Sequence, residues 1–250
     1  MKQLRIIIIT FITAGITGNC ASKPDIVLET KQSKVYKFEI GDANIYVIQG
    51  KKNIMIDTSN PGNEEKIVNA LKSINLDPKD ISLIILTHGH GDHSGNAKYF
   101  KEKYKIPIAG GQADLPMFKS GKMGELKSTG FMGTLVRPMA NYVSEPFDPD
   151  KIITEEISLS EFGVEGKVFQ MPGHTAGSLV AIIENKFAFV GDLMRGSLNS
   201  GKSPTEHFFH FNRELVKQNI KKLLDQGIEV FYVGHWGPIA AADAKKEFFE

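Results

Sequence analysis

The sequence predicts an α/β fold for most of the chain. Short apolar runs typical of buried strands alternate with segments whose apolar residues recur at helical spacing, as Ile67, Leu71 and Ile74 do in residues 63–75. A length of 250 residues is enough for one sizeable domain with a single core, or for two small domains. Ligand-type residues follow several of the predicted strands, so the same pattern also indicates a functional site.

The predicted strands share β-type runs bounded by turn residues and occupy 35–40, 44–49, 53–57, 81–86, 106–109, 167–171, 179–184, 186–190 and 229–233. The predicted helices occupy 63–75, 94–104 and 212–226. Asn212 has the chemistry of an N-cap, and Gly227 follows the end of the third helix. Residues 110–150 have no clean period, and we expect a loop packed on the body or a cap over a site.

The most informative motif runs from Thr87 to His93 and directly follows the predicted strand 81–86. It contains three histidines and an aspartate within six residues, at His88, His90, Asp92 and His93. The intervening glycines allow a turn on which these side chains face one point. Neutral imidazole and carboxylate groups suit zinc, and less selectively iron or manganese. The motif therefore predicts a metal site.

Four more residues of the same chemistry each follow a predicted strand. They are Asp57, His174, Asp192 and His235. Open α/β sheets bind ligands at the carboxyl ends of their strands. The series therefore predicts that residues distant in the sequence meet at one edge of the sheet.

This ordered set resembles the metallo-β-lactamase superfamily: an aspartate, then His-x-His-x-Asp-His, a later histidine, an aspartate and a final histidine. The resemblance covers about residues 35 to 240 and is nearest to the branch of glyoxalase II and lactonase metallohydrolases. It implies a four-layer αββα sandwich of two mixed sheets with flanking helices.

The resemblance also implies a role for each matching residue. His88, His90 and His174 would bind one divalent ion, Asp92, His93 and His235 a second, and Asp192 would bridge them. Asp57 would orient the motif loop by hydrogen bonds rather than bind metal. The implied ions are most simply Zn²⁺, with iron or manganese as alternatives.

The implied reaction is hydrolysis. Two ions roughly 3.5–4 Å apart can hold a bridging hydroxide that attacks an ester, thioester, lactone or related bond of a small substrate. Asp92 would also carry the proton. Ser94 and Ser178 are interpreted as turn or capping residues.

Three alternatives stay open. Persulfide dioxygenases of this superfamily use one iron bound by residues equivalent to His88, His174 and Asp192. The β-lactamases usually carry Cys or Ser where this chain has Asp192. A non-catalytic lipoprotein module would have lost ligands, whereas every ligand position is filled here.

Arg195 and Trp236, which lie near Asp192 and His235 in the sequence, are candidate substrate-binding residues. Arg195 stands where acyl-homoserine lactonases carry a tyrosine. A structural interpretation makes Arg195 a salt-bridged residue, and it makes His207 and His210 loop residues that are exposed or partly buried.

The N-terminus has the order of a secretory signal: Lys2 and Arg5, then an apolar run to Ile16, then small residues before Cys20. This segment resembles a lipoprotein signal, with Cys20 as the lipidated residue. We expect a signal at 1–19, a tether at 20–34 and the catalytic domain at 35–250. The chain would then be anchored in the cell envelope on the extracytoplasmic side, the alternatives being a soluble secreted protein and a retained membrane anchor.

The charge balance limits the partners. The chain has 30 basic and 29 acidic residues, so it offers no electrostatic footprint for nucleic acid. A single cysteine cannot form an internal disulfide. The expected partners are a small-molecule substrate and, through the lipid anchor, a membrane. The sequence is equally consistent with a monomer and a homodimer.

Overall fold

The computed structural model describes residues 24–250, so the predicted signal and Cys20 lie outside the described residues. One sheet has seven strands that lie side by side in sequence order. They are β1 (Asp25–Glu29), β2 (Lys34–Ile40), β3 (Ala43–Gln49), β4 (Asn53–Ile56), β5 (Ile81–Ile85), β6 (Ile108–Gly111) and β7 (Lys151–Ile153). Strands β1 to β4 pair antiparallel, and β4 to β7 pair parallel.

The second sheet has six strands in the order β15-β14-β11-β10-β9-β8. They are β8 (Ile157–Ser158), β9 (Gly166–Gln170), β10 (Leu179–Ile183), β11 (Phe187–Gly191), β14 (Val230–Val233) and β15 (Ile239–Ala240). Within this sheet only β11 and β14 pair parallel. Strands β12 (Arg195–Gly196) and β13 (Pro204–Thr205) form a small ribbon beside it.

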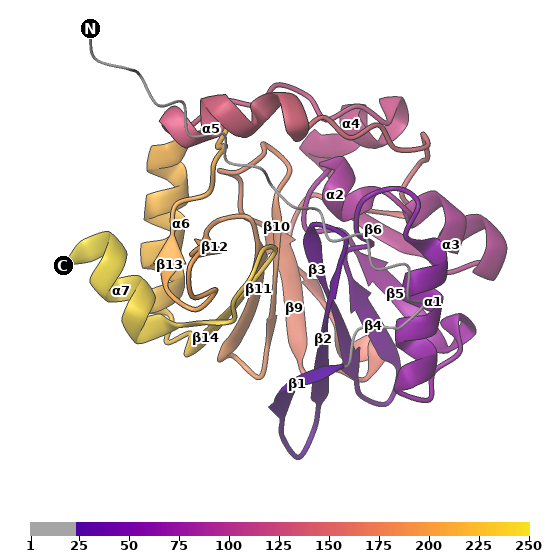
Figure 1. The fold of residues 1–250 in the computed structure, drawn as a ribbon. Helices are drawn as coiled ribbons and strands as arrows, with labels where there is room; N and C mark the ends of the chain where they lie inside the picture. Colours follow the sequence, from indigo (N-terminus) through magenta and orange to yellow (C-terminus); the bar gives the residue numbers. More distant parts are fainter. Residues whose placement is uncertain (1–23) are drawn as a thin grey trace, which may run out of the picture.

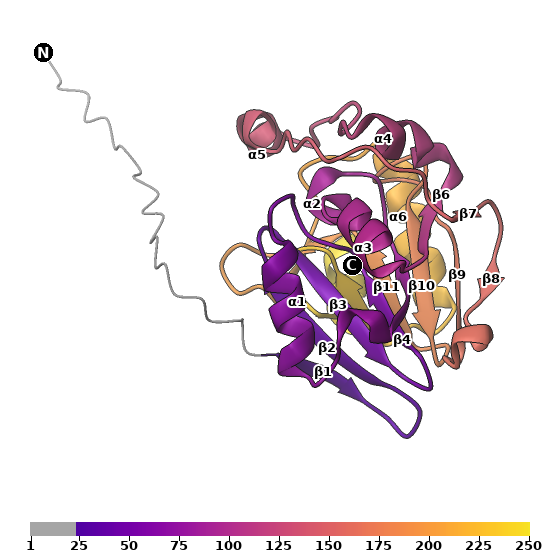
Figure 2. The same ribbon diagram turned by 90° about the vertical axis from the view of Figure 1, so that its right-hand side faces the viewer.

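The helices are α1 (Glu64–Ser73), α2 (Gly91–Ser94), α3 (Ala97–Tyr104), α4 (Leu115–Ser120), α5 (Phe131–Val136), α6 (Arg213–Asp225) and α7 (Ala241–Phe249). Helices α1 and α3 cover the outer face of the first sheet, and α6 and α7 cover that of the second (Figures 1 and 2). Helices α4 and α5 lie across the end of the sandwich where α2 is found (Figure 1). In residues 24–250, no helix combines the length and the apolar character that crossing a bilayer requires.

Strand alternation explains the four layers. In β10, Leu179, Ala181 and Ile183 enter the cluster between the sheets, while Val180 and Ile182 pack under α6 and α7. Strand β3 divides its residues in the same way between the inter-sheet cluster and the α1 side. The predicted αββα sandwich of two mixed sheets is therefore confirmed.

The structure corrects two predicted boundaries. The expected tether contains β1, which pairs antiparallel with β2 and packs Val27 and Leu28 against the inter-sheet cluster. The helix predicted over 94–104 begins later, because Ser94 is the last residue of α2 and α3 starts at Ala97. The backbone of Asn96, with φ at −113° and ψ at 12°, leaves the helical region and so separates the two helices.

Candidate metal centre

The ligand-type residues come from the ends of strands and from one short helix. Asp57 follows β4, His88 follows β5, Asp192 follows β11 and His235 follows β14. His174 comes from the turn after β9. The rest of the motif lies on α2, whose single turn carries Asp92 and His93, with His90 at its N-cap position. The carboxyl ends of strands from both sheets thus meet at one edge of the sandwich.

One carboxylate oxygen lies at the centre of the cluster. The Oδ2 atom of Asp192 is 3.2 Å from the Nε2 atom of His235, 3.4 Å from that of His93, 3.6 Å from that of His174 and 3.8 Å from that of His88. His90 reaches the same cluster, with its Nδ1 atom 3.0 Å from Nε2 of His174.

These atoms form groups with metal-binding spacing. In each group the possible ligand atoms all lie within 4.8 Å of one another: His88 with His90 and His174, His88 with His93 and Asp192, Asp92 with His93 and His235, and His174 with Asp192 and His207. We call the residues of these groups the cage.

Two properties of the cage fit a bound metal: the short distances between its ligand atoms, and buried polar atoms that lack a hydrogen-bond partner. His88 Nε2, Asp92 Oδ1 and Asp192 Oδ1 are buried and have no hydrogen-bond partner among the described residues. Buried polar atoms nearly always have a partner, so three such orphans in one cluster indicate that a ligand satisfies them. The donors are imidazole and carboxylate, a set that suits zinc, iron or manganese.

An oxygen holds the outer nitrogen of three cage histidines. Nδ1 of His93 lies 2.8 Å from Asp57 Oδ2, Nδ1 of His174 lies 2.8 Å from the Phe209 carbonyl, and Nδ1 of His235 lies 2.6 Å from the Asp42 carbonyl. Such contacts fix the orientation of a ligating imidazole and leave the inner nitrogen for a metal.

Asp57 holds the motif loop as well as His93. Its Oδ1 accepts the backbone N–H of Thr87 at 2.7 Å, and its Oδ2 accepts the Thr87 hydroxyl at 2.8 Å. The Asp57 backbone is in the left-handed region, with φ at 62°, which is uncommon for a residue other than glycine. The loop after β4 therefore adopts an unusual conformation that aims this carboxylate at the motif.

Burial keeps three cage imidazoles neutral. It lowers the pKa of His88 and His174 well below the usual value and that of His90 to about 4. Neutral imidazole is the form that binds a metal. These three residues are therefore ready to act as ligands at neutral pH.

Four of the remaining cage residues carry charge. Burial opposes protonation of His93 and His235, but the nearby carboxylates outweigh it, so the pKa of His93 is raised and that of His235 rises to about 10. Burial also opposes ionisation of Asp92 and Asp192, yet the surrounding histidines hold both pKa values below the usual range. The carboxylates therefore attract positive charge, which protons or a divalent cation can supply.

Asp114 is a buried residue of the site that sequence reasoning missed. Its Oδ2 accepts the Gly89 N–H at 2.8 Å and the Thr175 hydroxyl at 2.7 Å, while its Oδ1 accepts the Gly177 N–H at 2.8 Å. It thus ties the motif loop to the loop of His174. The only signal in the sequence is an acid in a mostly apolar stretch, which does not identify its partners.

Residues 110–150, here called the arm, pack over the site. A side chain at Gly91 of the motif would stand 2.7 Å from Cβ of Tyr142, and one at Gly89 would stand 2.8 Å from Met117. The arm also forms an isolated bridge from Ser128 to Phe209. It therefore contacts both the histidine motif and the loop that precedes α6.

The structure corrects the interpretation of His207 and His210 as exposed or partly buried. Their exposed fractions are 6% and 3%, and Nε2 of His207 lies 3.2 Å from Asp192 Oδ2. The neighbouring phenylalanines, Phe208, Phe209 and Phe211, are the only sign of this burial in the sequence. The arm and the loop together cover them.

Arg195 is not the salt-bridged residue of the structural interpretation. It is 6% exposed, its NH1 donates to the Gly196 carbonyl at 2.9 Å, and its Nε is buried with no partner among the described residues. In residues 24–250 it forms no ion pair. Its guanidinium carbon stands 4.1 Å from the ring centre of Phe208 and 5.6 Å from that of Trp236. The ring of Trp236 lies 5.9 Å from that of His235, so both candidate substrate-binding residues border the cage.

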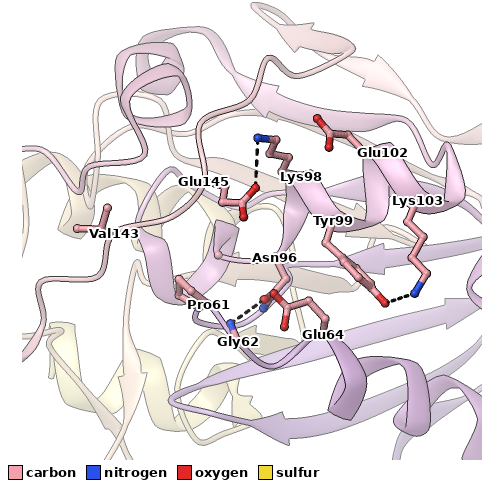
Figure 3. A pocket seen from close by; sticks show the side chains of 11 residues that line it. Pro61, Gly62, Glu64, Asn96, Lys98, Tyr99, Glu102, Lys103, Val143 and Glu145 are labelled. Atoms are coloured by element: carbon pink, nitrogen blue, oxygen red, sulfur yellow. Dashed lines mark hydrogen bonds and ion pairs between the residues drawn. The ribbon is translucent and has the colours of Figure 1, made fainter.

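A separate hollow of about 550 Å³ lies between α3 and the loops at Pro61 and Glu145 (Figure 3). Its two lysines already have partners, because Lys98 pairs with Glu145 at 3.2 Å and Lys103 donates to the Tyr99 hydroxyl at 2.7 Å. None of the cage residues lines this hollow.

Comparison with known proteins gives consistent matches over most of the chain. The model of the family described as "Metallo-beta-lactamase superfamily" matches residues 39–235. A "probable metallo-hydrolase" of Methanocaldococcus jannaschii is 27% identical over 194 residues, which are 77% of this chain and 87% of that protein. A hydroxyacylglutathione hydrolase of Haemophilus influenzae is 28% identical over 138 residues, which are 54% of this chain and 58% of that enzyme.

Solved structures agree with the fold. A metallo-beta-lactamase family protein from Thermus thermophilus has a TM-score of 0.62 at 20% identity, covering 85% of this chain and 77% of its own. A subclass B3 metallo-beta-lactamase of Bradyrhizobium japonicum has a TM-score of 0.57 at 17% identity, covering 87% and 79%. At these identities the likeness concerns the fold alone.

Proposed function

The chain belongs to the metallo-beta-lactamase superfamily, and from this premise we propose that it is a metal-dependent hydrolase of a small substrate containing an ester, thioester, lactone or related bond. Relatives named as metallo-hydrolases support hydrolysis as the reaction type. The observation that carries the proposal is the convergence of imidazole nitrogens on Asp192 Oδ2.

The proposed ligands divide into two sets that hold two divalent ions. His88, His90 and His174 form one set, Asp92, His93 and His235 form the other, and Asp192 lies between them. Zn²⁺ fits these donors best, with iron or manganese as alternatives. Ions bound there would polarise the scissile bond and lower the pKa of a water so that a nucleophile exists at neutral pH.

The remaining work falls to residues of the chain. Asp57 and the Phe209 and Asp42 carbonyls hold the outer nitrogens of His93, His174 and His235, so the ligands keep their directions during the reaction. The Oδ2 atom of Asp92 lies 3.5 Å from Nε2 of His235, while its Oδ1 atom has no hydrogen-bond partner among the described residues. We assign to Oδ1 the proton that is released when water attacks.

Arg195 and Trp236 bind the substrate in this proposal. A buried guanidinium without an ion-pair partner in the described part of the chain favours an anionic group, either a carboxylate or a phosphate. The substrate would therefore carry negative charge at a position beside the bond that is cleaved.

Metal content and turnover test the main proposal together. Protein purified without chelator should contain about two equivalents of divalent metal, and it should hydrolyse members of a panel of lactones, thioesters, β-lactams and phosphodiesters. His90→Ala and Asp92→Ala should abolish turnover while the far-UV spectrum stays unchanged. The exposed Asp243→Asn is the control. Less than one equivalent of metal in the wild type, or full turnover in both variants, contradicts the proposal.

The same experiment separates the alternatives. One iron per chain with oxygen-dependent turnover of a persulfide would favour the dioxygenase reaction. Hydrolysis confined to β-lactams would identify an antibiotic hydrolase. A folded protein that binds no metal would fit the non-catalytic module.

The substrate-binding role has its own test. Arg195→Met should raise KM for an anionic substrate at least ~10-fold and leave KM for its neutral amide or methyl ester unchanged. Equal losses for both substrates would show that Arg195 acts only on structure.

The proposal extends to location. Cys20 carries lipid and anchors the chain on the extracytoplasmic side of a membrane. Wild-type protein should then be recovered with membranes and incorporate labelled palmitate. Cys20→Ser should do neither. If Cys20→Ser remains in the membrane fraction, the N-terminal segment is itself an anchor, and soluble wild-type protein would indicate secretion.

A further inference from the structure

His207 lies outside the set of residues by which the chain resembles its family, yet it enters the cage. It is carried by the segment between β13 and α6. Its Nε2 lies 3.2 Å from Asp192 Oδ2, the same distance as Nε2 of His235. Together with His174 and Asp192 it forms one of the groups whose donor atoms all lie within 4.8 Å.

The contact with Asp192 is not an ordinary hydrogen bond. The hydrogen bonds that His207 forms with described residues through its ring involve only its Nδ1 atom. Nε2 therefore approaches a carboxylate oxygen closely without a suitable N–H direction. The Nε2 atoms of His88, His174 and His235 face the same oxygen, at 3.8, 3.6 and 3.2 Å.

The outer nitrogen of His207 faces two backbone groups of Phe209. The N–H donates to Nδ1 when the imidazole proton is on Nε2, and the carbonyl accepts from Nδ1 when the proton is there. Its Nδ1 lies 3.3 Å from the Phe209 carbonyl oxygen, which is also 2.8 Å from Nδ1 of His174. When Nδ1–H donates to this carbonyl, Nε2 is the atom with the free lone pair. One backbone oxygen thus orients two imidazoles toward the same carboxylate.

Packing fixes the ring in this position. The His207 ring stacks on that of His235 with centroids 5.4 Å apart, and it meets the His174 ring edge-on at 4.7 Å. The His207 carbonyl accepts the hydroxyl of Thr129 from the arm at 2.7 Å. Both the side chain and the backbone are therefore held in place before any ligand arrives.

We propose that His207 is a further metal-ligating residue, donating Nε2 to the cation bound on the His174 and Asp192 side of the cage. This inference rests on the metal cage of the proposed function. His210 provides the contrast: it is equally buried and comes from the same segment, but it belongs to none of the metal-binding groups found in residues 24–250.

The first test counts ligands in the wild type. The chain has seven histidines, of which six belong to the cage and one, His210, does not. In Zn²⁺-loaded protein with ¹⁵N-labelled histidine, the proposal expects six imidazoles with a metal-bound nitrogen and one without, namely His210. Five metal-bound imidazoles, with His207 free, would overturn it. A wild type that binds no Zn²⁺ would overturn both this inference and the proposed function.

The second test uses variants and the metals alone. His207→Asn keeps an amide next to the Phe209 backbone but removes the Nε2 donor, and His210→Ala is the matched control. Competition with a chromogenic chelator should show at least ~10-fold weaker binding of one Zn²⁺ in His207→Asn and no change in His210→Ala. The visible spectrum of the Co²⁺ form should change only in His207→Asn.

Thermal unfolding in EDTA establishes that both variants are folded. Identical Zn²⁺ affinity and Co²⁺ spectrum in His207→Asn and the wild type would overturn the inference. Equal losses in both variants would also overturn it, because the effect would then belong to the loop and not to the Nε2 donor. If His207→Asn does not fold, the count of metal-bound imidazoles in the wild type decides.

Discussion

The Oδ2 atom of Asp114 accepts a hydrogen bond from the backbone N–H of Gly89, at the centre of the histidine motif, with a length of 2.8 Å. Because the same carboxylate accepts from Gly177, one side chain holds the two loops that present His88 and His174. The arrangement of the cage thus depends on Asp114, which is not itself one of the cage residues.

Asp114→Asn should destabilise the protein by about 1–3 kcal/mol, because an amide must turn an N–H group toward one of the three donors that the carboxylate now accepts. Urea unfolding at neutral pH measures this loss. Asp243→Asn, on the exposed side of α7, should change the free energy of unfolding by less than about 0.5 kcal/mol. Equal midpoints for Asp114→Asn and the wild type would contradict the prediction.

Asp57→Asn should weaken metal binding by about 10- to 100-fold and leave the fold intact. Asparagine tolerates the left-handed backbone of this position, but it cannot accept from both Thr87 and His93 as the carboxylate does. Chelator competition gives the affinity, and circular dichroism checks the fold. An affinity equal to that of the wild type would show that His93 needs no such support.

Gly234→Ala should disturb the cage directly. A methyl group there would overlap Oδ1 of Asp192 and stand 2.6 Å from Cε1 of His93. Metal content after dialysis should therefore fall. Gly130→Ala is the matched control, since its added carbon would meet nothing within 4 Å. The prediction fails if both variants keep the metal content of the wild type.

Metal binding should become stronger as the pH rises. The pKa of His235 is raised to about 10 by Asp192 and Asp92 in spite of burial, so without a bound cation this imidazole is protonated at neutral pH. Ligation requires the neutral form, and a cation must therefore displace the proton. Calorimetric titration with Zn²⁺ in two buffers of different ionisation enthalpy should show proton release. Affinity that does not change between about pH 6 and about pH 8 would contradict this.

The sequence predicts the parts of the site whose chemistry is local. The motif from His88 to His93 follows an apolar strand, and Asp192 and His235 each follow another, so the strand pattern alone indicates that these residues meet at one edge. The layers follow from the same alternation, which β10 shows most fully.

The parts that sequence reasoning missed depend on tertiary contacts. Asp114 acts on backbone groups 25 and 63 residues away, in a stretch without a period. His207 is buried because the arm packs on the loop that carries it, as the bond from Thr129 shows. The lack of a partner for Nε of Arg195 depends on residues distant in the sequence. Strand β1 escaped notice because three apolar residues among polar ones resemble a tether.

The bridge between Ser128 and Phe209 joins the arm to the loop that carries His207. The arm and the cage can therefore vary separately in sequence although they are in contact. The cage residues follow strands throughout the chain, whereas the arm above them is one contiguous stretch. Exchanges in residues 115–150 would change that surface and leave Asp114 and every cage residue as they are. Diversification of this protein would therefore be concentrated there.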